Sequence, residues 1–115
     1  MSQAAGELNP IIHTTTRLSI MAVLASATEL EFGTARDASG LSDSVLSKQA
    51  AALESAGYVA IRKGHIGRRP RTWLSLTKAG RRALRSHVAA LQHLVALATT
   101  DPNPRPPGPD TSATP

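Results

Sequence analysis

One stretch of this 115-residue chain decides its fold: residues 42–77 read SDSVLSKQAAALESAGYVAIRKGHIGRRPRTWLSLT. Ser42 offers the hydroxyl of an N-cap, and apolar residues at helical spacing follow it to about Ala56, where Gly57 ends the pattern. Just upstream, residues 34–39 predict a short helix that ends at Gly40. Two helices joined by a tight glycine-containing turn predict a helix-turn-helix.

After this helix the apolar residues change from helical spacing to strict alternation. Residues 58–63 and 72–76 each predict a strand, and the side chains on their inward face are Val59, Ile61, Leu74 and Leu76. Glycine and proline separate the two strands, at Gly64, Gly67 and Pro70. We therefore expect a β-hairpin with a long basic tip.

Further helices are expected on both sides of this stretch. Asn9 and Pro10 supply an N-cap and a first-turn proline for a short helix through Ile12, and residues 17–27 predict a helix buried on most sides. Residues 29–32 form a connector, and Thr77 caps a last helix from 78 to about 98. This order predicts a mainly α fold with a small β-hairpin (α+β), a winged helix-turn-helix with dimerising terminal helices.

The length fits a single domain. We expect a flexible N-terminus at residues 1–7, a winged-helix domain for DNA binding and dimerisation at 8–99, and a disordered proline-rich tail at 100–115. Six of the eight prolines lie in that tail, which has no large apolar side chain. A folded part of this size is only marginally stable alone, so a partner is expected.

Several functional classes are excluded by composition. The absence of cysteine excludes disulfides, Cys-type zinc sites and thiol redox sensors. No membrane span or signal peptide is apparent, so we expect a cytoplasmic protein. The abundance of Ala and the excess of Arg (10) over Lys (3) indicate a GC-rich bacterial genome, and we expect the protein to associate with the nucleoid. We find no phosphate loop or catalytic series, and we expect neither enzymatic activity nor a cofactor nor a metal. His87 and His93 point about 120° apart on one helix and cannot chelate one ion together.

Charge is concentrated in the middle of the chain. The net charge is +5, but residues 48–85 alone contain ten basic residues and one acidic residue. Such a block favours a polyanionic partner over a solvated face of mixed charge.

On the predicted helix after Ser42, Leu46, Ala50, Leu53 and Gly57 share the core-facing side. Small polar side chains lie opposite and allow close approach to base edges in a major groove, although an ordinary solvent face has the same composition. The candidate DNA contacts here are Ser42, Ser44, Ser47 and Lys48.

The hairpin carries a second set of candidates. Five cations crowd one short segment, and no acidic residue within it offsets their repulsion. Arginine binds phosphate through two donors and fits a narrow minor groove. The candidate phosphate or minor-groove contacts are Arg62, Lys63, Arg68, Arg69 and Arg71.

Five segments carry a resemblance to a known family: RLSIM at 17–21, LSD and LSK at 41–43 and 46–48, LESAGYV at 53–59, GRRPRTW at 67–73 and LTKAGR at 76–81. From about Asn9 to Leu97 the chain resembles the compact winged-helix group of MarR/ArsR-like transcriptional regulators. The resemblance implies a homodimeric DNA-binding regulator whose third helix is the recognition helix and whose hairpin is the wing. Residues 49–52 depart from the family's larger or basic side chains, which implies fewer contacts from the helix and more from the wing.

The last helix carries an apolar stripe with heptad-like spacing. A domain this small has little surface to cover it, so we expect homodimerisation, although part of the stripe must pack on its own domain. The candidate interface residues are Ile11, Ile12, Leu84, Val88, Leu91, Leu94, Val95 and Ala98.

The predicted function is sequence-specific binding of a pseudo-palindromic double-stranded DNA operator by a homodimer, with an unknown small-molecule effector as a further possible partner. One alternative is a winged-helix protein-interaction module that does not bind DNA. A second is a structured-RNA binder, which the scarcity of aromatic side chains disfavours.

Overall fold

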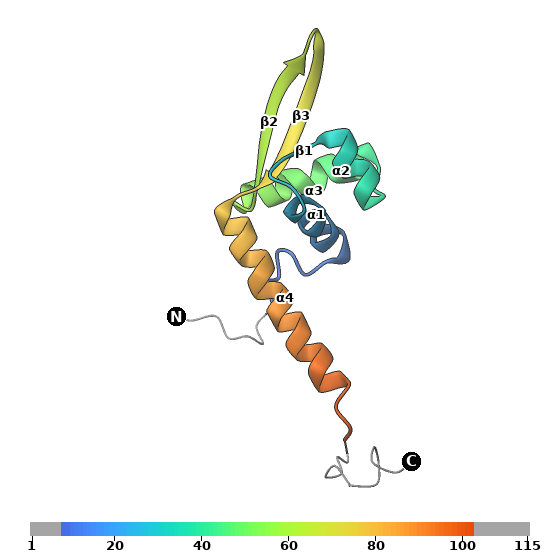
Figure 1. Ribbon diagram of the computed structural model, residues 1–115, viewed down its shortest axis with the longest axis vertical. Helices are drawn as coiled ribbons and strands as arrows, with labels where there is room; N and C mark the ends of the chain where they lie inside the picture. Colours follow the sequence, from blue (N-terminus) through green and yellow to red (C-terminus); the bar gives the residue numbers. More distant parts are fainter. Residues whose placement is uncertain (1–7, 103–115) are drawn as a thin grey trace, which may run out of the picture.

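The computed structural model describes residues 8–102, so the expectations for residues 1–7 and for the tail from residue 103 lie outside it. Its elements in order are α1 (Thr15–Ala25), β1 (Leu30–Glu31), α2 (Phe32–Ser39), α3 (Asp43–Ser55), β2 (Val59–Ile66), β3 (Arg69–Leu76) and α4 (Lys78–Ala98) (Figure 1). This arrangement confirms the predicted mainly α winged helix-turn-helix.

Hydroxyl side chains cap the N-termini of three helices, α1, α3 and α4. Thr14 accepts a hydrogen bond from the backbone N–H of Arg17 at 3.3 Å, and Ser42 accepts one from that of Val45 at 3.2 Å. Thr77 caps α4 in the same way. Each cap satisfies a backbone donor that the first helical turn leaves free, which explains why the predicted starts of α3 and α4 are confirmed.

The prediction of a short helix from Pro10 through Ile12 is wrong. Residues 10–12 form a turn. The side-chain oxygen of Asn9 accepts a hydrogen bond from the backbone N–H of Ile11 at 2.9 Å, and the backbone carbonyl of Asn9 accepts one from the N–H of Ile12 at 3.2 Å. An asparagine that bonds to the backbone two residues on makes a turn instead of a helix start.

The sheet is larger than expected. The predicted connector at 29–32 contains β1, which pairs antiparallel with β3 through Leu30 and Leu74, giving the strand order β1-β3-β2. The prediction of a long basic tip is also wrong, because the pairing of β2 with β3 continues to residues 66 and 69. A two-residue turn remains, with Gly67 at φ 62° as a hairpin turn of this length requires.

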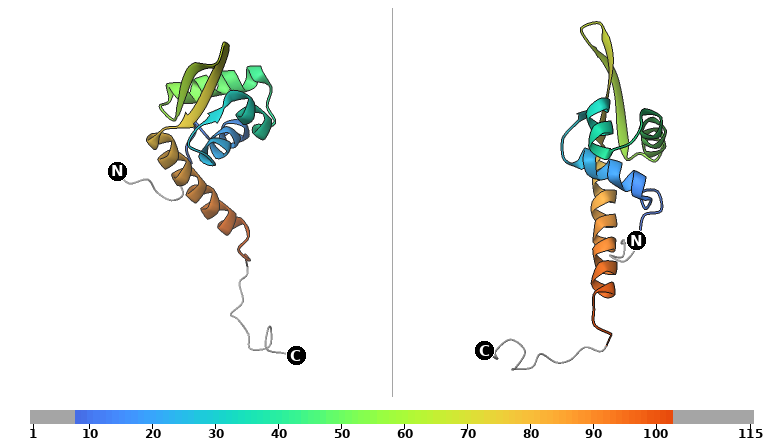
Figure 2. Two further views of the ribbon diagram at one scale, coloured as in Figure 1. Left: turned by 45° about the horizontal axis from the view of Figure 1, so that its top comes forward. Right: turned by 90° about the vertical axis from the view of Figure 1, so that its right-hand side faces the viewer.

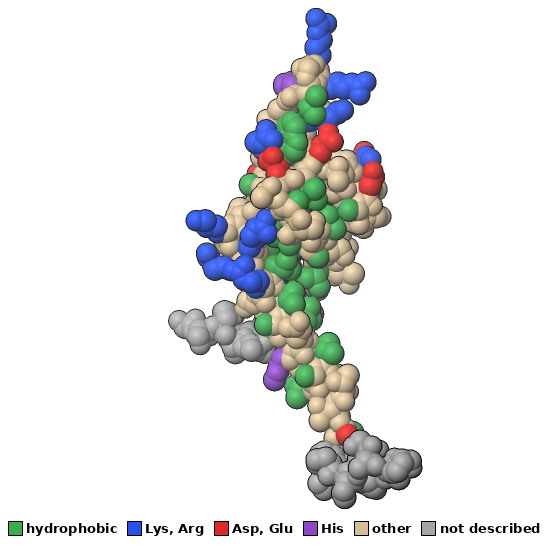
Figure 3. Space-filling model, viewed as in Figure 1, with side chains coloured by type: hydrophobic (Ala, Val, Ile, Leu, Met, Phe, Trp, Pro, Cys, Tyr) green, Lys and Arg blue, Asp and Glu red, His purple; other side chains and the backbone are tan. Residues whose placement is uncertain are grey.

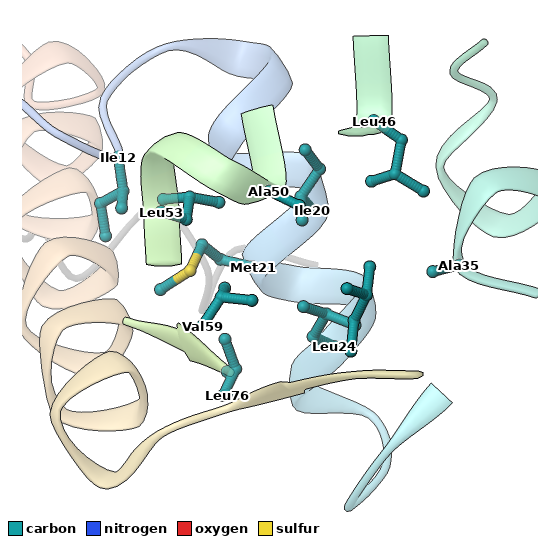
Figure 4. Packing of buried hydrophobic residues seen from close by; sticks show 11 residues of the cluster. Ile12, Ile20, Met21, Leu24, Ala35, Leu46, Ala50, Leu53, Val59 and Leu76 are labelled. Carbon is teal, nitrogen blue, oxygen red and sulfur yellow. The ribbon is translucent and has the colours of Figure 1, made fainter. Parts of the chain in front are cut away.

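The core lies between α1, α3 and the inner face of the sheet (Figure 4). The largest fully buried side chains of residues 8–102 are those of Ile12, Ile20, Met21, Leu24, Leu46, Leu53 and Leu74 in this core, and that of His87 on α4. Gly57 is exposed, contrary to its predicted place on the core face, because α3 ends before it.

The wing formed by β2 and β3 projects from one end of this lobe, while α4 leaves it in the opposite direction (Figures 1 and 2). The helical lobe therefore separates two extended features of different chemistry.

Candidate nucleic-acid interface

Helix α3 has one buried face and one polar face, as its sequence predicts. Leu46, Ala50 and Leu53 are at most 1% exposed. Ser44, Ser47, Lys48 and Ala51 are exposed on the other side. The exposed surface is thin because three of these four side chains are small, so another molecule can approach the helix backbone closely.

Arg17 of α1 links α3 to the N-terminal segment from outside the core. Arg17 donates through Nε to the side-chain oxygen of Gln49 at 2.8 Å, and through Nη1 to the carbonyl of Ile11 at 3.1 Å. The side chain of Gln49 is thereby used within the lobe. Ser42 is exposed, but its hydroxyl caps α3.

A hollow of about 750 Å³ separates α3 from the wing. Its rim is formed by Ser47, Ala51 and Glu54 from α3, and by Lys63 and Thr72 from the wing. Lys63 and Thr72 are partners in the strand pairing and so lie on the same face of the hairpin. The structure thus brings Lys63 to the same side as the polar face of α3.

The wing tip carries exposed cations. Arg68 lies in the turn and Arg69 begins β3, and both are exposed. Lys and Arg side chains gather on the wing in Figure 3. Across residues 8–102, no carboxylate pairs with Lys63, Arg68 or Arg69.

The other two wing arginines are paired, which corrects the expectation that no acid offsets the wing charge. Arg62 makes two hydrogen bonds to Glu29, Nε to Oε2 at 3.0 Å and Nη2 to Oε1 at 2.9 Å. Arg71 forms an ion pair with Glu31. The hydrogen bond from Arg62 lowers the pKa of the Glu29 carboxyl, so this acid stays ionised. Both acids come from the segment predicted as a connector.

The apolar stripe of α4 is largely uncovered in the single chain. Leu94 is 42% exposed, and Val95 and Leu97 are each 60% exposed. Val88 and Ala98 are exposed too, and Leu91 is half-buried. Figure 3 shows hydrophobic side chains along this part of the helix.

The remaining candidates for the dimer interface face inward. Ile12 lies fully buried in the core, so its side chain offers no surface to a partner. Ile11 and Leu84 are partly buried and pack against the same core.

A polar chain that the sequence did not reveal joins three distant segments. The backbone N–H of Asn9 donates to Nδ1 of His87 at 2.9 Å, and the side-chain amide of Asn9 donates to the hydroxyl of Tyr58 at 2.9 Å. The ring of His13 meets that of His87 edge-on at 5.5 Å. Burial, and then the nearby His13, lower the pKa of His87, so the neutral ring is favoured.

This chain of contacts borders a hollow of about 800 Å³ between the N-terminal segment and α4. Asn9, Ile11, Tyr58, Arg82 and His87 contribute to its lining. Within the described part of the protein, no three His, Asp or Glu side chains gather closely enough to hold a metal ion. Likewise, no helix between residues 8 and 102 is long and apolar enough to cross a bilayer.

Some of these features left a trace in the sequence and others did not. Glu29-Leu30-Glu31-Phe32 alternates between acidic and apolar residues, which is the spacing of a short strand with both acids on one face. The link from Asn9 to His87 spans 78 residues and follows no local pattern.

Comparison with known proteins agrees with the fold. Residues 16–95 match the model of the family described as "Winged helix DNA-binding domain". No curated protein sequence matches the chain.

Several solved structures are similar. A transcriptional regulator homologue from Pyrococcus horikoshii OT3 is 24% identical with a TM-score of 0.72, over 78% of this chain and 89% of that one. A putative regulator of the MarR family from Enterococcus faecalis V583 is 25% identical with a TM-score of 0.63, over 76% and 78%. BpsR of Bordetella bronchiseptica, whose DNA binding is regulated by 6-hydroxynicotinic acid, is 14% identical with a TM-score of 0.66, over 84% and 73%. The predicted resemblance to MarR-like winged-helix regulators is confirmed.

Proposed function

We propose that this chain, which belongs to the winged helix DNA-binding domain family and resembles MarR-family transcriptional regulators, binds duplex DNA sequence-specifically as a homodimer. One observation carries the proposal: Lys63 borders the same hollow as the polar face of α3, and Arg68 and Arg69 are exposed at the wing tip, all three without a carboxylate partner among residues 8–102. A charged group without a carboxylate partner is available to phosphate.

In this proposal α3 enters a major groove. Ser44, Ser47 and Lys48 approach base edges, and the hydroxyl of Ser42 lies at the start of the helix, where the backbone N–H groups favour a phosphate. Arg68 and Arg69 reach the neighbouring minor groove or its phosphates. Arg62 and Arg71 are not among the proposed DNA contacts, because they are paired with Glu29 and Glu31.

The dimer forms through the exposed part of α4. Exposed apolar stripes on small proteins usually mark an interaction surface. Val88, Leu91, Leu94, Val95 and Ala98 would pack on their symmetry equivalents. A twofold pair then presents two copies of α3 to successive major grooves about 34 Å apart, which favours a pseudo-palindromic operator.

We further propose that a small aromatic carboxylic acid, similar to the ligand of BpsR, regulates binding from the hollow beside His87. Arg82 would pair with the carboxylate and Tyr58 would supply a polar contact. Titration with 6-hydroxynicotinic acid should raise the melting temperature of the parent chain, and Arg82→Ala should abolish that rise.

We also propose that the protein acts in the bacterial cytoplasm, in association with the nucleoid.

Fluorescence anisotropy with duplex DNA tests the proposed function. Arg68→Ala/Arg69→Ala should weaken binding on the order of 30-fold at physiological salt and flatten the slope of log K against log salt by roughly 1.8, because each lost phosphate contact removes about 0.9. Lys78→Ala is the control, since this exposed lysine begins α4 and lies on neither α3 nor the wing. Equal affinity for the parent and the double variant would contradict the assignment of the wing.

A further inference from the structure

The hairpin register sorts the wing's charged side chains onto two faces. Pairing of residues 63 and 72 places Lys63 toward α3, on the face that borders the hollow. Because side chains alternate along a strand, Arg62 and Arg71 lie on the opposite face. Trp73 lies on that face too, as the strand partner of Arg62.

Arg62 is held on this outer face by two different groups. Its guanidinium carbon lies 4.1 Å from the centre of the Trp73 ring, while its donors form the two bonds to Glu29. Gly64 leaves room for the ring, since a Cβ there would lie 3.1 Å from Trp73. Stacking and a bidentate carboxylate together fix the direction of the guanidinium group.

Arg71 is held in a similar way from the adjacent strand. Glu31 pairs with Trp73 in the sheet, and its carboxylate reaches Arg71 two residues away along β3. Both members of this pair are about one-third exposed, at 33% and 35%. Glu29 and Glu31 thus neutralise two wing cations from one short segment.

The tip cations differ from this pair. Lys63, Arg68 and Arg69 have no carboxylate partner among residues 8–102. A phosphate that binds one of them displaces only water and counterions, whereas a phosphate that binds the Nε and Nη2 donors of Arg62 must first displace Glu29. The wing therefore contains available cations and occupied ones.

We propose, on the basis of the proposed function, that Glu29 and Glu31 limit the affinity for DNA by withholding Arg62 and Arg71 from its phosphates. Affinity for random DNA depends almost wholly on the number of phosphates that a protein neutralises. By keeping two arginines occupied, the acids remove up to two phosphate contacts from that number. Their removal should therefore tighten binding to random DNA and steepen its dependence on salt.

The test uses the full chain, a random-sequence duplex of about 30 base pairs and a duplex enriched from a random library, in a salt series from ~0.05 to ~0.3 M. Glu29→Gln should tighten binding to the random duplex by roughly 5-fold at ~0.15 M salt and steepen its salt slope by about 0.9, the value for one new phosphate contact. Glu31→Gln should act in the same direction.

A double-mutant cycle separates release of the arginine from a mere change in charge. Arg62→Ala should alter binding little in the parent but abolish the gain in the Glu29→Gln background. Asp37→Asn is the matched control, because this exposed acid lies on α2, away from α3 and the wing, and its partner Arg36 keeps its ion pair with Asp43. It makes the same change in charge and should leave the salt slope unaltered.

Two results would overturn the proposal. One is a Glu29→Gln variant that binds random DNA no more tightly than the parent, which would mean that Glu29 orients Arg62 for a DNA contact instead of withholding it. The other is an equal steepening of the salt slope by Asp37→Asn. If the parent itself shows no salt-dependent binding to either duplex, the proposed function has failed and this proposal fails with it, an outcome that the parent titration alone identifies.

Discussion

The first half of α4, residues 78–87, is attached to the lobe, whereas residues 91–98 extend away from it (Figure 1). Leu94, Val95 and Leu97 in this last part are exposed. Near its start, the Thr77 hydroxyl donates to the carbonyl of Gly57 at 2.6 Å, and Arg81 donates to the carbonyl of Ala27 at 2.9 Å. At the other end of this half, His87 accepts from Asn9. The two parts of this helix therefore differ: its first half completes the lobe, and its last part carries apolar side chains that the lobe does not cover.

The largest expected effect comes from breaking the attachment of the first half. A Cβ at Gly80 would lie 2.1 Å from the carbonyl oxygen of Tyr58, which belongs to the backbone and cannot turn aside. Gly80→Ala should therefore cost about 3 kcal/mol or more in free energy of unfolding, as overpacking in a rigid site does. Urea unfolding measures this loss.

Gly33→Ala is the control for that experiment. Gly33 lies within α2, and a Cβ there would meet only the flexible end of Arg36 at 3.7 Å. Alanine is the better helix former by up to about 1 kcal/mol, so stability should stay equal or rise. A Gly80→Ala protein as stable as the parent would show that the junction is loose.

The next largest effect concerns the exposed part of α4. Leu94→Glu/Val95→Glu places two carboxylates in the proposed dimer interface and should weaken self-association by on the order of 100-fold. Sedimentation equilibrium measures this change. Ala96→Glu is the control, because this exposed residue lies off the heptad stripe. A parent chain that sediments as a monomer at all concentrations would contradict the dimer.

A smaller effect concerns His87, where the two parts of α4 meet. Its pKa in the folded protein is lowered, first by burial and then by His13, so below about pH 6.5 the unfolded chain binds the proton while the folded chain resists it. Stability should therefore be full above pH 6.5 and fall as the pH decreases, by about 1.4 kcal/mol per pH unit until the folded ring itself titrates.

Urea unfolding at pH 7.5 and 5.5 tests this prediction. His87→Gln should flatten the difference in stability between the two pH values, while His93→Gln, at an exposed position on the same helix, should preserve it. A difference that is unchanged by His87→Gln would assign the pH dependence to other groups.

The smallest effect lies within the lobe. Ser42→Ala removes the hydroxyl that caps α3 and should cost about 1 kcal/mol in free energy of unfolding. Ser55→Ala, at the other end of α3, should cost less. If the two variants were equally stable in urea, the cap would not contribute.

Local chemistry explains which elements the sequence could predict. The helices α3 and α4 follow from Ser42, Thr77 and the apolar spacing after them, all of which act within one or two turns. The hairpin was anticipated from its alternating residues, but its length was not, because backbone pairing continues through residues that have no apolar alternation. A sheet gains its hydrogen bonds from the backbone whatever the side chains are.

The candidate site shows the same limit. The exposed face of α3 follows from its helical period. The state of the wing arginines does not, because Glu29 lies 33 residues from Arg62 and meets it only after β1 joins the sheet. Counting charge along the chain therefore overestimated the number of available cations.

Sedimentation velocity of the full chain with a labelled duplex enriched from a random library, at ~0.15 M salt, measures affinity and stoichiometry together. We predict a complex of two chains per duplex that Arg68→Ala/Arg69→Ala weakens and Lys78→Ala leaves intact. A library that yields no enriched duplex, or a complex with one chain that persists in the double variant, would contradict it.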